Sequence, residues 1–183
     1  MSNTIVADIQ HLAELIRGIR IAIMTTVCAD GSLRSRPMAV LESEFDGTLW
    51  FFTRVDSMKV AEVADEGQVN LSYADPAGVR FISISGRATV DLDPQKIEKL
   101  WTADLEPWFP GGLNDPQLGL LRVDADKWES WETQSGVMVT LEGSLKAPPA
   151  EFVHEHDDHR RLDLSGVWVS QDVGNSQTRN DPK

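Results

Sequence analysis

The chain has 183 residues, 41% of them hydrophobic, and its 17 basic and 29 acidic side chains give a formal charge of −12. This length suits one domain with a substantial core, and the acidic balance excludes nonspecific nucleic-acid binding through a basic surface. No apolar run is long enough to span a bilayer, the N-terminal residues lack a signal-peptide pattern, and the single cysteine, Cys28, excludes an internal disulfide. We therefore expect a soluble cytoplasmic protein that binds neither nucleic acid nor membrane, with Cys28 as a buried or half-buried structural residue.

The first predicted element is an amphipathic helix over residues 3–17. Its apolar side chains recur at the spacing of one helix face, namely Ile5, Ile9, Leu12 and Ile16. Gly18 follows as a C-terminal stop.

Segments with the composition of β-strands, separated by turn residues, make up most of the following chain. These segments are residues 20–28, 33–42, 48–54, 68–75, 79–92 and 118–133. The first two pair as a hairpin, and Gly86 inside a long strand indicates a bulge or a close backbone approach. Residues 136–147 fit either a helix or a strand.

Helices interrupt this pattern at two further points. A short helix is predicted at about residues 57–65, with Asp56 as its N-cap, and Asp93 and Pro94 open another. A loop over residues 106–117 follows. The whole pattern predicts a mainly β protein, an antiparallel barrel that is closed or partly closed, with short flanking helices. One domain is expected over residues 1–165, and residues 166–183 are expected to form a flexible polar tail.

Lys59 stands where a helix favours an acid. A cation in the first helical turn opposes the helix dipole by about 0.3–1 kcal/mol. The conflict disappears if an anion lies at the helix start, where backbone N–H groups, the Ser57 hydroxyl and Lys59 would converge on it.

The strand over residues 33–42 supplies more positive charge. Arg34, Arg36 and Met38 alternate onto one face, so Arg36 and Lys59 could flank a phosphate, with Thr53 donating from the preceding strand. Pro37 lacks a backbone donor and marks an edge position. The alternative is that the cations here are ordinary surface charges paired with Glu42, Glu62 or Asp65.

The order of several motifs resembles the pyridoxamine 5'-phosphate oxidase-like FMN-binding split barrels, and within them the general stress protein branch. The similarity covers roughly residues 5–165. The motifs are "RSRPM", "LWFFTRVDSMK", "ISISGRA", "EPWFPGGLNDPQLGLLRV" and "WESWE". The resemblance implies a homodimer of split barrels with FMN at the interface.

It also implies a set of flavin-binding residues. Arg36, Ser57 and Lys59 would hold the FMN phosphate with Thr53 nearby, the main chain of residues 37–39 would face the isoalloxazine edge, and Trp108 would line the pocket. The cofactor-binding set is thus Arg36, Pro37, Met38, Ala39, Thr53, Ser57, Met58, Lys59 and Trp108. Trp108 and Phe109 could instead form a hydrophobic plug under their loop. Trp128 and Trp131 are expected in the core or the dimer interface.

The function implied is that of an FMN-dependent oxidoreductase linked to stress response, acting on a small-molecule redox substrate. Vitamin oxidation is not expected, because the chain lacks the C-terminal Arg/His segment of true pyridoxamine phosphate oxidases. No side chain is marked as a catalytic acid or base; His11, on the first helix, is a poor candidate. The alternatives are a flavin-binding or sensing protein without turnover, a barrel that uses FAD, deazaflavin or haem, and an acidic barrel that acts through protein contacts without a cofactor.

Three histidines lie together near the C-terminal end of the domain, at His154, His156 and His159. Their spacing matches no metal motif. A solvated charged loop is expected, and no metal site is predicted.

Overall fold

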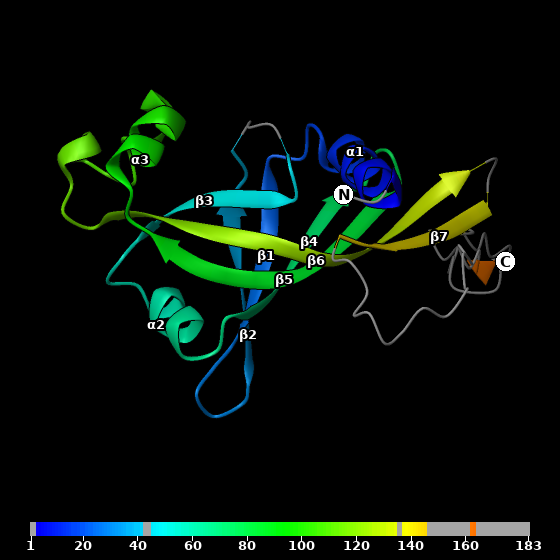
Figure 1. Cartoon of the computed structure of the whole chain (residues 1–183), viewed down its shortest axis with the longest axis horizontal. Helices are drawn as coiled ribbons and strands as arrows, with labels where there is room; N and C mark the ends of the chain where they lie inside the picture. Colours follow the sequence, from blue (N-terminus) through cyan, green and yellow to red (C-terminus); the bar gives the residue numbers. More distant parts are fainter. Residues whose placement is uncertain (1–2, 42–44, 135–136, 146–161, 164–183) are drawn as a thin grey trace, which may run out of the picture.

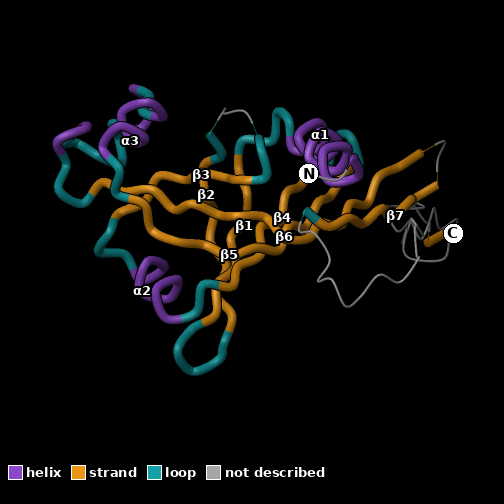
Figure 2. Tube along the Cα trace, viewed as in Figure 1, coloured by secondary structure: helices purple, strands orange, loops and turns teal. Residues whose placement is uncertain are grey.

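The computed structural model describes residues 3–41, 45–134, 137–145 and 162–163. These residues form three α-helices, two short 3-10 helices and eight strands (Figures 1 and 2). The α-helices are α1 (Asn3–Ile16), α2 (Met58–Asp65) and α3 (Pro94–Leu100). The 3-10 helices span Ala103–Leu105 and Gly112–Asn114. The strands are β1 (Ile21–Val27), β2 (Leu33–Ala39), β3 (Thr48–Arg54), β4 (Gln68–Asp75), β5 (Arg80–Asp91), β6 (Leu118–Gln134), β7 (Val137–Ser144) and β8 (Leu162–Asp163).

The strands form one antiparallel sheet in the order β2-β1-β4-β5-β6-β7-β8. The 17-residue β6 is long enough to pair with two strands in succession on the edge opposite β5. Its first half pairs with β3 and its second half with β7. β2 approaches β3 without hydrogen-bonding to it as a neighbour, so the sheet over the described residues stays open. The predicted mainly β, split-barrel fold is confirmed.

The main core lies between the sheet and α1. Alternate side chains of the strands point into it, among them the fully buried Met24, Phe51, Leu71 and Ile84. Trp128 is also buried there, as expected, and its ring contacts His11 of α1 at a centroid distance of 5.3 Å.

A second, smaller core lies under α3, and we call it the α3 cluster. It consists of Phe52, Ile97, Trp101, Leu105, Phe109, Leu118 and Leu120. The rings of Phe52, Trp101 and Phe109 meet at tilted or edge-on angles, with centroids 5.7–6.3 Å apart. α3 itself begins as predicted, because the Asp93 carboxylate accepts a hydrogen bond from the Gln95 backbone N–H and Pro94 is the first helical residue.

In the strands, one further sequence expectation is met and one open alternative is resolved. The register of β5 against β6 shifts at Gly86, where an added Cβ would collide with the main-chain carbonyl of Asp124, so this position requires glycine. The segment that fitted either a helix or a strand is β7.

Some expectations fall on residues that are not described. The histidines at 154, 156 and 159 and the tail over residues 166–183 lie outside the described part of the chain. Among the described residues, no helix has the length and apolar character needed to cross a membrane.

Candidate functional site

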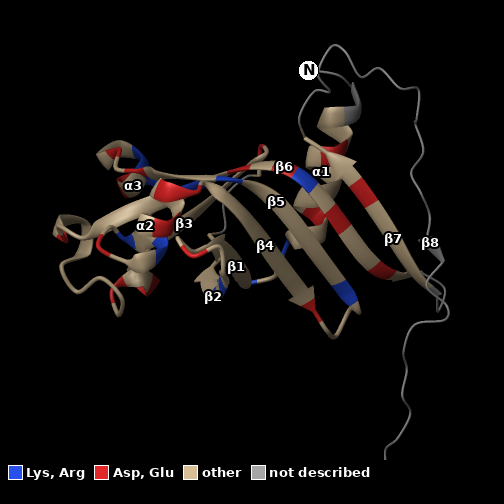
Figure 3. Cartoon of the chain, turned by 90° about the horizontal axis from the view of Figure 1, so that it is seen from below, with Lys and Arg blue, Asp and Glu red and all other residues tan. Residues whose placement is uncertain are grey.

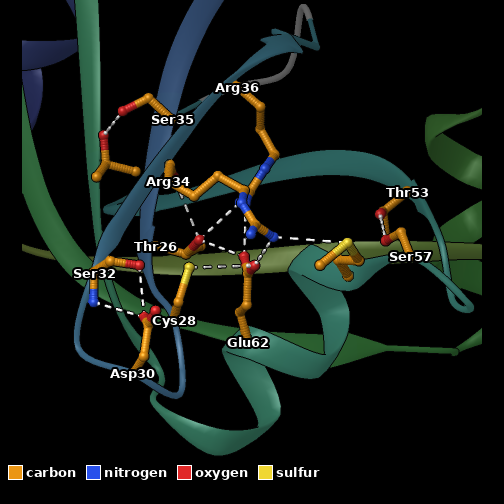
Figure 4. A network of polar contacts seen from close by, with 12 residues as sticks. Thr26, Cys28, Asp30, Ser32, Arg34, Ser35, Arg36, Thr53, Ser57 and Glu62 are labelled. Atoms are coloured by element: carbon orange, nitrogen blue, oxygen red, sulfur yellow. Dashed lines mark hydrogen bonds and ion pairs between the residues drawn. The ribbon is translucent and has the colours of Figure 1, made fainter.

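A polar cluster lies where α2 packs against the β1–β2 hairpin (Figure 4). We call it the α2 cluster and define it as Thr26, Arg34, Arg36, Lys59 and Glu62. Arg34 and Arg36 are alternate residues of β2 and therefore share a face, as predicted. In the β1–β2 register Arg34 lies opposite Thr26, and the Thr26 hydroxyl accepts a hydrogen bond from Nη1 of Arg36 at 2.8 Å (Figure 4).

Glu62 is the centre of this cluster, with a side chain only 9% exposed. Its Oε2 accepts hydrogen bonds from the Thr26 hydroxyl and from Nη2 of Arg36, each at 2.6 Å. Its Oε1 accepts from Nη1 of Arg34 at 2.6 Å, and the Cys28 thiol lies 3.7 Å from the same oxygen. Both carboxylate oxygens are therefore engaged by charged or polar donors.

The protonation state of Glu62 follows from these contacts. Burial alone would raise the pKa of the carboxyl, but the hydrogen bonds from Thr26 and Arg36 and the positive charges of the two arginines bring it below its usual range. Glu62 is therefore an anion at neutral pH. The sequence offered it only as one of several surface partners, and its burial was not foreseen.

The predicted hydroxyl pair lies at the start of α2. Thr53 is 2% exposed, and its Oγ1 is 3.4 Å from the Ser57 Oγ. Ser57 is the N-cap residue, but its side chain makes no capping hydrogen bond, and the first turn of α2 contains no acidic residue. The start of the helix is thus neither capped by a side chain nor compensated by an acid.

The N-cap prediction for Asp56 was wrong. Its two carboxylate oxygens accept from Nε and Nη2 of Arg54, at 3.2 and 3.1 Å, instead of from the helix. The bidentate geometry of a guanidinium competes well with backbone N–H groups for a carboxylate two residues away. Arg54 itself is exposed.

Lys59 is half-buried in the first turn of α2. Burial lowers the pKa of its ammonium group, and the nearby charge of Arg36 lowers it further. The structure therefore brings Arg36 and Lys59 within electrostatic reach of each other from two elements 23 residues apart in sequence number.

The charges of the α2 cluster do not balance. Arg34, Arg36 and Lys59 carry three positive charges against the single negative charge of Glu62, while Arg54 and Asp56 neutralise each other alongside. A local excess of two positive charges in a chain of formal charge −12 is an arrangement suited to a dianion. Figure 3 shows that basic and acidic residues lie together around α2, whereas acidic residues predominate on β6 and β7.

The other predicted site residues are spread around the cluster. β2 is the end strand of the sheet order, so the outer edge of Pro37–Ala39 pairs with no strand among the described residues; Pro37 and Ala39 are exposed and Met38 is buried. Met58 is 66% exposed, with its sulfur 3.7 Å from Nη1 of Arg34.

Trp108 and Phe109 behave differently from each other. Phe109 is buried in the α3 cluster, as the plug alternative proposed, whereas Trp108 is 66% exposed. Within the described chain, Trp108 makes no hydrogen bond or ring contact with the α2 cluster. Trp131 is partly buried on the outer face of the sheet, beside a hollow that Ile23 and Phe81 also line.

Comparisons with known proteins identify the family. Residues 7–149 match the family model described as pyridoxamine 5'-phosphate oxidase like. Protein bli-3 of Neurospora crassa is 29% identical over 125 residues, which are 63% of this chain but only 60% of the Neurospora protein.

Solved structures agree with this assignment. The general stress FMN/FAD binding protein of Xanthomonas citri is 30% identical, with a TM-score of 0.61 over 70% of this chain and 92% of that one. A Clostridium acetobutylicum protein related to general stress protein 26 has a TM-score of 0.65 over 76% of this chain and 95% of its own, and at 18% identity it supports the fold alone. With the family model matched over most of its length, the chain belongs to the pyridoxamine 5'-phosphate oxidase-like family.

Proposed function

We propose that this protein binds FMN and that the α2 cluster holds the cofactor's phosphate. The observation that carries the proposal is the excess of two positive charges beside an uncapped helix start in a strongly acidic chain. A phosphate monoester carries about −1.5 to −2 charges at neutral pH, which matches that excess. The Xanthomonas citri relative, named as an FMN/FAD binding protein, supports the same cofactor class.

Each residue has a distinct part in the proposed site. Arg36 and Lys59 pair with phosphate oxygens, while the Ser57 hydroxyl and the first N–H groups of α2 donate to them. Thr53 orients Ser57 through their hydroxyl contact. The open edge of Pro37–Ala39 offers main-chain groups to the isoalloxazine ring.

The exposed Trp108 suits a pocket completed by a second copy of the chain, with one flavin at each side of a homodimer interface. We further propose that the protein is a cytoplasmic oxidoreductase, linked to stress response as the names of its relatives suggest, in which the flavin ring transfers hydride or electrons to a small molecule. The chain's own residues would bind and orient the cofactor.

Cofactor binding is tested by purifying the protein and titrating the cofactor-free chain with FMN. We expect Arg36→Ala and Lys59→Ala each to weaken FMN binding by about 1.5–3 kcal/mol, the value of a hydrogen bond to a charged group. Lys127→Ala is the matched control, because it removes one positive charge from an exposed position on β6. An unchanged dissociation constant in both cluster variants would refute the site. Bound haem or deazaflavin, identified from the absorption spectrum, would refute the choice of cofactor.

Turnover is tested separately. Anaerobic titration of the FMN-loaded protein with NADH or NADPH should bleach the flavin absorbance if the protein is an oxidoreductase. A flavin that binds tightly and stays oxidised with both reductants would favour the alternative, a flavin-binding protein without turnover.

A further inference from the structure

Glu62 is an unexpected residue for an anion site. Its negative charge lowers the positive potential of the α2 cluster, and taking a carboxylate out of water costs several kcal/mol, a cost that only well-placed partners offset. Helix α2 nevertheless points this carboxylate at the arginines from a position that is 9% exposed. Its contribution to anion binding must therefore lie in the geometry it imposes on the arginines.

Each arginine bonds to a different oxygen of Glu62. Arg34 donates to Oε1 and Arg36 to Oε2, so one anion lies between two like charges on one strand face. Arg36 is also held at a second point, because its Nη1 donates to the Thr26 hydroxyl at 2.8 Å while that hydroxyl donates to Glu62. Glu62 and Thr26 together fix the plane of the Arg36 guanidinium.

Arg36 keeps donors for a ligand in this arrangement. A guanidinium has five N–H donors, and among the described residues Arg36 uses one on each terminal nitrogen. Its side chain is 17% exposed, against 45% for Arg34. Arg36 is thus held at two points and largely buried, whereas Arg34 is the more exposed arginine of the pair.

We propose that Glu62 is a positioning residue for phosphate binding, which acts with Thr26 to hold Arg36 in the orientation that meets the cofactor's phosphate. The inference rests on the proposed function, since it names how that same site is organised. Glu62 does not touch the phosphate in this scheme and acts only through Arg36.

The substitution Glu62→Gln distinguishes this role from simple charge counting. Glutamine keeps the shape of the side chain and removes one negative charge, so electrostatics alone predicts tighter binding of an anion. Loss of the Arg36 orientation predicts weaker binding. The glutamine NH2 group is a donor, and it would replace a carboxylate oxygen that now accepts from Thr26, Arg34 or Arg36. The two explanations therefore predict opposite signs.

The experiment titrates wild type, Glu62→Gln and Glu66→Gln with FMN and with riboflavin, which lacks the phosphate. Glu66→Gln makes the same charge change on an exposed residue at the end of α2 and should match wild type. We expect Glu62→Gln to weaken FMN binding about tenfold or more, as removal of an orienting second-layer partner does at metal sites. Riboflavin binding should not change.

Thr26→Val provides a second test without any charge change, since it removes only the hydroxyl from a fully buried position. It should weaken FMN binding in the same direction and also spare riboflavin. Equal or tighter FMN binding by both variants would overturn the positioning role, and an equal loss for riboflavin would show a general structural defect instead. A wild-type protein that fails to bind FMN would refute the proposed function itself, which separates the two failures.

Discussion

The α3 cluster and the start of α2 meet at neighbouring residues of β3, but the α2 and α3 clusters are built on opposite principles. Phe52 of β3 packs into the aromatic α3 cluster, while Thr53 points to the other face, towards the start of α2. The α3 cluster is stabilised by buried apolar surface. The α2 cluster instead contains a buried carboxylate and an excess of two positive charges. The excess of positive charge costs stability in the empty protein, as the lowered pKa of Lys59 indicates, and a ligand site can tolerate this cost where a purely structural core cannot.

The largest expected effect would come from the α3 cluster. Phe109→Ala should lower the free energy of unfolding by about 3 kcal/mol, because it leaves a cavity among Phe52 and Trp101. Urea unfolding measures it, with the exposed Leu113→Ala as the control. The FMN affinity of Phe109→Ala, measured without urea, should stay close to that of wild type. A loss of affinity as large as that of Arg36→Ala would show that the two clusters are not functionally separate.

The second expected effect is a pH dependence from Glu62. Its pKa lies below the ordinary glutamate value of about 4.3, so its contribution to stability is present above that ordinary value and is lost as the pH falls through the lowered pKa. Glu62→Gln should therefore lower the free energy of unfolding by about 2 kcal/mol at neutral pH, which is the scale of hydrogen bonds to a charged group. Urea unfolding of both proteins measures this difference. The difference should vanish in acid. A difference independent of pH would mean that packing, and not charge, accounts for the role of Glu62.

A smaller effect of opposite sign is expected at Lys59. The pKa of Lys59 is lowered because burial and Arg36 disfavour its charged form, so the charge costs stability below that pKa and the cost fades as the pH rises through it. Lys59→Met should raise the free energy of unfolding of the FMN-free protein by about 0.5 kcal/mol, as expected for removing a cation from a first helical turn. The same variant should bind FMN more weakly. Reduced stability without FMN would contradict the view that the α2 cluster is strained without its ligand.

The smallest effect is expected at the rim of the α2 cluster. Arg54 and Asp56 form an exposed pair, and solvent screens such pairs so that they contribute little to stability. Arg54→Ala should leave unfolding and FMN affinity close to wild type, in contrast to Arg36→Ala. A large loss of FMN affinity would extend the phosphate site to the exposed end of β3.

Local patterns were enough to predict much of the candidate site. The alternation of Arg34 and Arg36 follows from strand geometry, and the conflict between Lys59 and the helix dipole can be seen in the order of residues alone. The capped start of α3 at Asp93 is likewise a signal carried by three adjacent residues. Where two local signals competed, as at Asp56, the sequence did not show which partner the carboxylate would take.

By itself, the sequence determined most of the strands and helices and the shared face of Arg34 and Arg36, because these depend on residues within a few positions of one another. Only the tertiary structure decided that Glu62 lies under the arginines, since its partner Thr26 is 36 residues away and meets it through the packing of α2 on β1. The sharing of β6 between β3 and β7 is also a long-range choice. The same residues that a local pattern assigns to a surface become a site when distant elements bury them together.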